Sequence, residues 1–264
     1  MEVDFFVEKS LDENASIYFD LAKKAKKKLE GTKRALLNEK KKLDALLSEQ
    51  SEVLKTDLKI KSEKDRKKNW YENFRWFFSS DGFLVIGGKD SSSNELIIKK
   101  HVDKNDLVFH TEAPGSPFVV IKNPNALAVP DLTKMEAAEL AVTFSKAWAM
   151  KIRSVEVFMV LPNQVSKEAN SGEYVAKGAF VIRGKKVLFD PVVNFAIGIF
   201  LDEDGNKIVM SGPRSAVKKK CNVFVEIKQG DSKKGEVSKI LMKKFGLSTN
   251  DDIIANLPSG GLKL

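Results

Sequence analysis

The 264-residue sequence contains only one cysteine, Cys221, and two histidines, His101 and His110. A single cysteine excludes an intrachain disulfide framework and leaves no cysteine pair for zinc. The two histidines show no H-E-x-x-H spacing and are too few for a histidine-rich metal site. We therefore expect a reducing, cytoplasmic setting, with no metal and no cofactor.

Long apolar runs and the common phosphate-binding motifs are also missing. No segment approaches the ~20 apolar residues of a membrane span, and the N-terminus has no apolar signal segment, so we expect no membrane partner. The sequence has no Walker loop and no G-x-G-x-x-G, and the GGKD at 87–90 is followed by serines instead of a helical pattern. Catalysis by His110 would need an orienting partner that the sequence does not show, and packing or hydrogen bonding is the alternative. We expect no catalytic residues and no enzyme.

Basic residues are in excess, with 45 lysines and arginines against 36 acidic residues and a net charge of +9. The surplus lies before residue 79 and after residue 190. On charge alone, a polyanion, either nucleic acid or an anionic membrane face, is therefore the first expected partner. A solvated lysine-rich surface, as in heat-adapted proteins, is the alternative interpretation.

Proline is absent from residues 1–113, which allows a long helix after a lead-in at residues 1–13. Apolar or small residues recur there at three- and four-residue steps, a heptad seam that includes Leu29, Leu36, Leu43 and Leu46. Because isolated helices draw most of their stability from tertiary packing, the seam needs a partner. We expect residues 62–78 to fold back as a second arm, giving a coiled-coil hairpin over 14–78 with its tip at 54–61. A dimeric coiled coil is the competing interpretation.

From residue 79 the sequence changes to short β-rich runs separated by glycine, proline and asparagine. The runs before residue 190 are FLVIGG, ELIIKK, LVFHTE, FVVIKN, VEVFMVLP, GAFVIRG and KVLFD, with one main helix at about 131–150. Strands in succession with one main helix predict an α+β fold for the domain at 79–190. Residues 191–264 repeat the pattern on a smaller scale, with strands at NFAIGIFL, KIVMS and NVFVEIK and a helix at about 235–245, and form a small α/β extension.

Two basic regions are candidate anion sites. Lysines and arginines fall at or near predicted strand ends, where loops would gather them on one rim able to contact phosphates. In SGPRSAVKKK, 211–220, a strand leads into a helix whose free N–H groups would favour an anion, with Arg214, Ser215 and Lys218 as candidate ligands. An ordinary helix beginning at proline is the alternative there.

Five aromatic residues lie where the hairpin is predicted to enter the sheet: Trp70, Tyr71, Phe74, Trp76 and Phe77. Burying these rings would fix the angle of the hairpin on the body. Base-stacking platforms are the alternative.

Several long motifs together resemble the C-terminal half of the NFACT family, the proteins of ribosome-associated quality control that are sometimes described as fibronectin-binding-like. They are WYENFRWFFSSDGFLVIGGKDSSSNELIIKK, VFHTEAPGSPFVVIKNP, QVSKEANSGEYVAKGAFVIRGKK and the tail VMSGPRSAVKKK with LPSGGLKL. Upstream, KSLDENASIYFDLAKKAKKKLEGTKRAL is similar to the start of that family's coiled-coil arm. The resemblance spans essentially the whole chain, and the tail is most similar to archaeal members.

The resemblance implies an RNA-binding NFACT-R domain that follows a coiled-coil arm. It implies large ribosomal subunit RNA and tRNA as partners, and a quality-control partner on the coiled coil. The family signature and the basic rim together give the candidate nucleic-acid-binding residues Arg75, Lys89, Asp90, Asn94, Lys99, His110, Lys122, Asn123, Gln164, Lys167, Arg183 and Lys185. Of these, we expect Lys89, Lys122, Lys167 and Arg183 to share one face near His110.

The NFACT-N domain and the helix-hairpin-helix module that precede this region in full relatives are not in the sequence. The resemblance is therefore compatible with a fragment, a stand-alone protein or a split-gene product with a separate NFACT-N chain as partner. Three functions stay open: an RNA- and ribosome-binding module, a scaffold acting through its coiled coil, and an undetected enzyme.

Overall fold

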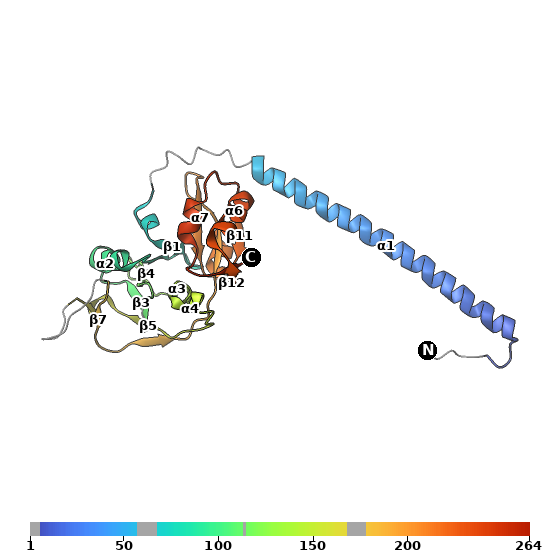
Figure 1. Ribbon diagram of the computed structural model, residues 1–264, viewed down its shortest axis with the longest axis horizontal. Coiled ribbons are helices and arrows are strands. Elements are labelled where there is room, and N and C mark those ends of the chain that lie inside the picture. Colours follow the sequence, from blue (N-terminus) through green and yellow to red (C-terminus); the bar gives the residue numbers. More distant parts are fainter. Residues whose placement is uncertain (1–5, 57–67, 113–114, 168–177) are drawn as a thin grey trace. The chain divides into compact units, whose positions relative to one another are not determined.

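The computed structural model describes residues 6–56, 68–112, 115–167 and 178–264, with the side chains of all these except residues 44–56. The chain divides into two compact units, residues 1–60 and 61–264, which are described separately below. Figure 1 shows one long helix in the first unit, and helices around β-sheets in the second.

The first unit is built around α1, which runs from Leu11 to Thr56. Its start is fixed by a reciprocal cap, in which the backbone N–H of Glu13 donates to Ser10 Oγ and that of Ser10 donates to the Glu13 carboxylate. The helix predicted through residues 20–50 is confirmed. The seam leucines are solvent-exposed, with Leu36 73% exposed. Leu46 lies among the residues whose side chains are not described.

The predicted second arm is wrong where the structure describes it. Residues 70–73 form a short 3₁₀ helix, η1 (Trp70–Asn73), and residues 75–78 form the strand β1 (Arg75–Phe78). β1 pairs antiparallel with β2 (Leu84–Gly87), and this pairing places the aromatic segment in a sheet. The remainder of the predicted arm and most of its tip, 57–67, lie outside the described residues.

The second unit contains a six-stranded sheet in which every neighbouring pair is antiparallel. Its strands, in spatial order, are β1, β2, β4 (Val119–Ile121), β3 (Leu107–Thr111), β5 (Val157–Val160) and β8 (Val187–Phe189). The helix α3 (Asp131–Thr143) packs on the sheet and buries Leu140 against it. This arrangement confirms the predicted α+β class.

Two predicted elements, one strand and one helix, need correction. The run ELIIKK is not a strand, because residues 91–100 form α2 (Ser91–Lys100), whose N-terminal N–H groups are capped by Asp90. The helical conformation of α2 buries the Ile97 side chain fully and leaves that of the neighbouring Leu96 exposed. The helix predicted at 131–150 is interrupted after Thr143, and α4 (Lys146–Ala149) restarts with its own cap at Ser145.

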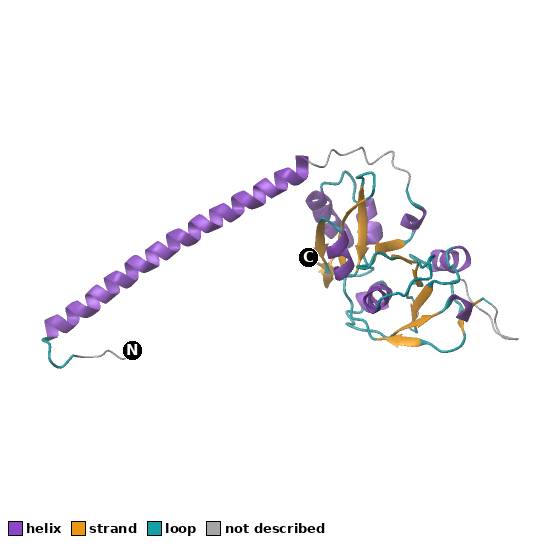
Figure 2. Ribbon diagram, turned by 180° about the vertical axis from the view of Figure 1, so that it is seen from behind, coloured by secondary structure: helices purple, strands orange, loops and turns teal. Residues whose placement is uncertain are grey.

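The C-terminal residues form a three-stranded antiparallel sheet in the order β10 (Lys207–Gly212), β9 (Ala196–Leu201) and β11 (Val223–Glu226). Three helices belong to the same region: α5 (Arg214–Lys220), α6 (Lys234–Phe245) and α7 (Asp251–Asn256). Two short two-stranded sheets complete the second unit. In one, β12 (Lys228–Ser232) pairs with β13 (Leu262–Lys263), and in the other, β6 (Val165–Ser166) pairs with β7 (Val181–Ile182). Figure 2 shows these helices beside the strands of the second unit. Trp76 meets Phe200 of β9 edge to face, so β1 joins the two sheets.

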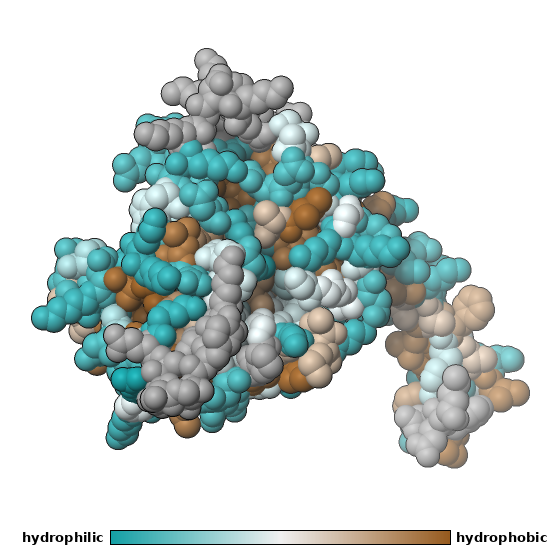
Figure 3. Space-filling model, turned by 60° about the vertical axis from the view of Figure 1, so that its left-hand side comes forward, coloured by the Kyte–Doolittle hydropathy of each residue, from teal (hydrophilic) through white to brown (hydrophobic). Residues whose placement is uncertain are grey.

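No described helix is long and apolar enough to cross a membrane. In the view of Figure 3, hydrophilic residues cover much of the second unit, and hydrophobic residues appear as separate patches between them. Isolated patches of this kind are ordinary for a folded surface.

Candidate nucleic-acid interface

A cavity of about 330 Å³ opens between the start of β1, the turn from β2 into α2, and the connection from β3 to β4. We call it the Arg75 cavity. Five of the predicted nucleic-acid-binding residues line it: Arg75, Lys89, Asp90, Asn94 and His110. Ser91, Ser116, Pro117 and Phe144 are among the other lining residues. The five predicted residues lie up to 35 positions apart in the sequence, from Arg75 to His110, and the complete lining extends from Arg75 to Ala179.

Arg75 is a buried cation at the first position of β1, and its side chain is 8% exposed. Its Nη1 donates to the carbonyl of Gly88 at 2.9 Å, and its guanidinium carbon lies 4.2 Å from the centre of the Phe144 ring. The Nε atom is buried and has no hydrogen-bond partner among the described residues. Burial lowers the pKa of Arg75 to about 10, which Asp90 partly opposes. The guanidinium therefore stays charged at neutral pH, and no described carboxylate forms an ion pair with it.

Lys89 is the second cation of the cavity and reaches it from the exposed turn before α2. Its Nζ donates to the backbone carbonyl of Glu72 at 3.4 Å, a long contact, and forms no ion pair with a described residue. Burial lowers the pKa of Lys89 first, and the charges of Arg75 and Lys68 lower it further, while Asp252 and Asp90 oppose the shift. The two cations of the cavity therefore repel one another, and a bound anion would relieve that repulsion.

The wall of the cavity on the α2 side is rigidly organised. The Asp90 carboxylate accepts the N–H of Ser93 at 2.8 Å, and the hydrogen bonds from Ser93 lower the pKa of Asp90. Asn94 is buried, and its Oδ1 accepts the N–H of Phe118 at 3.0 Å. The backbone of Gly88 lies against the Asn94 side chain, and a Cβ on residue 88 would stand 1.9 Å from Asn94 Oδ1. Glycine, which has no Cβ, avoids this clash. Asp90 and Asn94 thus shape the cavity. The N-terminal N–H groups of α2 are capped by the Asp90 side chain.

His110 forms part of the opposite wall. Its Nδ1 lies 2.9 Å from the carbonyl of Pro117, and because a carbonyl only accepts, this nitrogen carries the proton. The ring stacks on Phe118 with centroids 4.0 Å apart. Burial lowers the pKa of His110, so the ring is neutral at pH 7. These contacts hold the imidazole in place as an aromatic surface.

Lys99 and Lys167 belong to an ion-pair group on the outer face of α2. Both contact the carboxylate of Glu95, with Nζ–O distances of 2.7 Å for Lys99 and 3.5 Å for Lys167. Lys167 also lies 5.0 Å from the centre of the Phe180 ring. Their charges are partly neutralised, and neither lines the Arg75 cavity.

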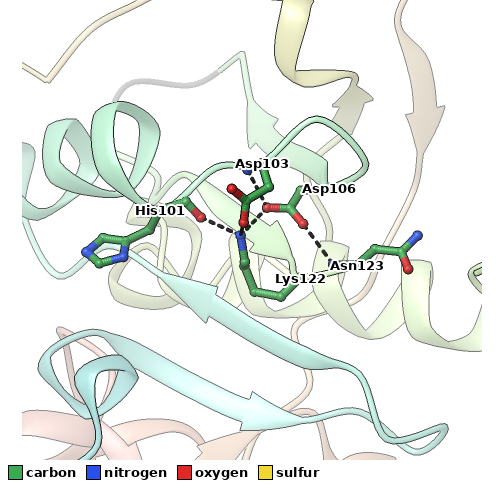
Figure 4. A network of polar contacts seen from close by, with 5 residues as sticks. All are labelled: His101, Asp103, Asp106, Lys122 and Asn123. Carbon is green, nitrogen blue, oxygen red and sulfur yellow. Dashed lines mark hydrogen bonds and ion pairs between the residues drawn. The ribbon is translucent and has the colours of Figure 1, made fainter. Parts of the chain in front are cut away.

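Lys122 and Asn123 serve the fold, which corrects their predicted place on an RNA-binding rim. Figure 4 shows that Lys122 Nζ points to three oxygens: those of the Asp103 and Asp106 carboxylates and the carbonyl of His101. The side chain of Lys122 is only 12% exposed, and that of Asp106 is fully buried. Asn123 is buried as well, and its side chain brackets the backbone of Leu127. Since Lys122 is engaged here, the four expected cations do not all present free charge beside His110.

Gln164, Arg183 and Lys185 lie around the β6–β7 hairpin. The Gln164 side chain accepts the N–H of Leu161 and donates to the carbonyls of Arg183 and Lys185, so it holds the loop together. The side chains of Arg183 and Lys185 are exposed. These two cations stay candidates for phosphate contacts, whereas Gln164 positions them.

The structure does not support the predicted anion site at the start of α5. Ser215 Oγ donates to the Glu136 carboxylate at 2.7 Å, and the N–H of Arg214 donates to Asn194 Oδ1. The Arg214 side chain is paired with Glu226 at 2.6 Å, and only Lys218 is left exposed and without a described partner. The protein's own side chains therefore occupy the positions that a bound anion would take.

The aromatic segment is divided between core and surface. Phe74, Trp76 and Phe77 are each at most 2% exposed, which agrees with the packing interpretation for these three rings. Trp70 is 43% exposed and stacks on His101, with centroids 4.7 Å apart and planes 7° apart. The sequence prediction missed Phe144 as the ring beneath Arg75, because nothing in the sequence links positions 69 residues apart.

One segment of the second unit matches a known family. Residues 73–184, which supply the whole Arg75 cavity, match the family described as the NFACT protein RNA binding domain. Residues 73–184 are an NFACT RNA-binding domain. The resemblance seen in the sequence is confirmed over this segment.

The chain is also similar to much longer proteins. It is 36% identical over 214 residues to the archaeal Rqc2 homologue of Methanocaldococcus jannaschii, covering 80% of this chain and 31% of that protein. It is 37% identical over 182 residues to the human ribosome quality control complex subunit NEMF, covering 67% of this chain and 16% of that protein. The corresponding subunit 2 of Schizosaccharomyces pombe is 31% identical over 243 residues, covering 87% of this chain and 22% of that protein. The chain spans no more than about a third of the length of these relatives.

A solved structure, the C-terminal part of the fibronectin/fibrinogen-binding protein from Streptococcus suis, is also similar. It is 26% identical, with a TM-score of 0.38 over 60% of this chain and 58% of that one.

Proposed function

We propose that this chain is an RNA-binding part of a ribosome quality control factor, and that it contacts RNA of the large ribosomal subunit or tRNA. The observation that carries the proposal is the pair of cations Arg75 and Lys89, which line one cavity and form no ion pair with a described residue. This pair lies in an NFACT RNA-binding domain, and the relatives named above are ribosome quality control proteins. The chain covers no more than about a third of these relatives, and the proposal is limited to RNA contact.

The proposed contact is electrostatic and has little sequence preference. Phosphate contacts position a protein on RNA without reading its bases. The exposed Arg183 and Lys185 extend the positive charge beyond the cavity, and Lys167 adds a partly paired cation. If about four phosphates are neutralised on irregular RNA, the logarithm of the affinity should fall with the logarithm of salt concentration at a slope of about −3, at ~0.7 per contact.

Fluorescence anisotropy with labelled tRNA across a salt series tests the proposal. The variant Lys89→Ala/Arg183→Ala/Lys185→Ala should bind more weakly and flatten the slope by about 2, from three contacts at ~0.7 each. The matched control removes three exposed lysines outside the cavity and the hairpin, as Lys104→Ala/Lys219→Ala/Lys263→Ala. An equal effect of both triple variants would show that only net charge matters and would contradict the proposed interface.

A scaffold function through α1 is the second candidate, and the exposed seam favours it. Leu29, Leu36 and Leu43 are each more than half exposed. Apolar heptad positions of this kind pack against a partner helix in coiled coils. A Leu29→Glu/Leu36→Glu variant should lose a protein partner captured in nuclease-treated extract but retain tRNA binding. Loss of tRNA binding alone would assign the seam to the RNA contact.

A further inference from the structure

The Arg75 cavity is unusual for the interior edge of a domain because it concentrates two positive charges, which the one carboxylate of the lining, Asp90, offsets only in part. An unpaired buried charge is costly, and breaking a buried ion pair typically has a strong destabilising effect. Arg75 receives only partial compensation from the Gly88 carbonyl and the Phe144 ring, and its Nε is left without a partner. A ligand anion at this position would supply the missing acceptor and charge.

The cavity is also larger than an anion alone requires. At about 330 Å³ it is within the range of small-molecule sites, which begins at about 300 Å³. A phosphate group takes the place of only a few waters, at ~30 Å³ each, and would leave most of the space empty. The rest of the lining suits a flat, partly polar group, since it combines the Phe144 and His110 rings with the hydroxyls of Ser91 and Ser116.

The groups that line the cavity differ in chemistry in the way that the parts of a nucleotide do. The charged half of the lining consists of Arg75, Lys89 and Asp90, and the neutral half consists of hydroxyls and aromatic rings such as that of His110. Unstacked RNA bases are commonly held on aromatic side chains or guanidinium planes, with hydrogen bonds to their edges. A duplex cannot enter a space of this size, so the matching RNA element is a nucleotide that is turned out of its stack.

We propose that the Arg75 cavity binds a single unpaired nucleotide of RNA, with the phosphate at Arg75 and Lys89 and the base beside the ring of His110. This inference rests on the proposed function, because it takes RNA as the source of the nucleotide. It adds to that function a saturable site that discriminates an extruded nucleotide from the continuous backbone of a duplex.

The proposal is tested by titrating the intact chain with adenosine 5′-monophosphate and uridine 5′-monophosphate and following ¹H–¹⁵N shifts and calorimetric heats. Both nucleotides should bind at one site, with shifts at Gly88, Ser91 and Gly178, which line the cavity. Adenosine, which lacks the phosphate, and inorganic phosphate, which lacks the base, should each bind at least tenfold more weakly. Equal binding of inorganic phosphate would overturn the nucleotide assignment and leave an anion site only.

Two substitutions probe the charged half. Lys89→Ala removes an exposed charge, so the fold should be kept, and the affinity for the nucleotides should fall at least fivefold. Arg75→Lys keeps the charge but removes Nε, and should weaken binding by a similar factor while the melting curve confirms folding. Lys104→Ala, an exposed lysine away from the cavity, should change nothing. Nucleotide affinities that are unaffected by both cavity variants would refute the proposal.

Binding of tRNA by the same variants separates this inference from the proposed function. If tRNA binds with a steep salt dependence but the mononucleotides do not bind, the nucleotide site is wrong and the RNA-binding function stands. If neither tRNA nor large ribosomal subunits bind, the proposed function fails, and saturable mononucleotide binding would then point to free nucleotides as the ligand, which also overturns RNA as its source.

Discussion

Removing the Lys122 ammonium tests whether this residue serves the fold or the RNA. Lys122→Met keeps most of the aliphatic side chain and removes only the charge. It would leave the Asp106 carboxylate, whose side chain is fully buried, without its cation. Asp106 would retain two backbone donors, the N–H groups of Asp103 and Asn123, each at 2.8 Å. Removing one partner of a buried ion pair typically costs about 3–5 kcal/mol.

The expected loss can be measured by thermal and urea denaturation of the full chain. For a unit of this size, each kcal/mol shifts the melting temperature by about 2–4 °C, so the variant should melt roughly 6–20 °C below the wild type. Lys104→Met is the matched control, because Lys104 is exposed on the loop that carries Asp103 and Asp106 and should change stability by no more than ~0.5 kcal/mol. A Lys122→Met protein that melts like the wild type but loses RNA binding would refute the structural role and return Lys122 to the interface.

Two further substitutions probe the core. Trp76→Ala should lower the free energy of unfolding by about 3–5 kcal/mol in denaturation. The reason is that Trp76 is 2% exposed and packs against the rings of Tyr71, Phe78 and Phe200. Unchanged stability with lost RNA affinity would show a stacking role instead. Burial raises the pKa of Glu139 from 4.5 to about 7, with a smaller rise from Glu136, so between these pH values the folded state binds more protons than the unfolded state. The free energy of unfolding should therefore fall by about 3 kcal/mol as the pH rises from 4.5 to 7, and Glu139→Gln should remove that decline and be the more stable protein at pH 8. A wild-type and a Glu139→Gln profile of the same slope would contradict the assignment.

Much of the second unit could be predicted because its strands carry a local signal. Runs such as FVVIKN and NFAIGIFL are rich in β-branched and aromatic residues and end at turn residues, and both contain strands in the structure. The long α1 was predictable for the same reason, since a proline-free heptad pattern is a local property. The order of the strands in the sheet carries no such signal and came only from the structure.

The errors have physical causes that a single sequence hides. ELIIKK has three consecutive apolar residues, which suit a buried strand as well as a helix, and the cap at Asp90 with Ser93 is a common but weak signal. The segment 70–78 has aromatics at helical spacing, yet the pairing with β2 holds Arg75–Phe78 extended. Tertiary pairing overrode the local pattern at residues 75–78, whereas at residues 91–100 the local cap at Asp90 accompanies a helix that the apolar run alone did not indicate.

The site was predictable by residue type but not by role. The family signature and the charge pattern named Arg75, Lys89 and His110 among the candidates, and the structure places these three residues in the lining of one cavity. Nothing in the sequence shows that Lys122 meets Asp103 and Asp106, which lie 19 and 16 residues away. Whether a cation is free or paired is decided by contacts between distant segments.

Sedimentation with large ribosomal subunits at low and high salt is the most direct test of the central claim. The wild-type chain should sediment with the subunits at low salt and be released as salt rises, and Lys89→Ala/Arg183→Ala/Lys185→Ala should be released at lower salt than Lys104→Ala/Lys219→Ala/Lys263→Ala. Binding that is indifferent to salt and to the first triple variant would contradict an electrostatic RNA interface at the Arg75 cavity and the β6–β7 hairpin.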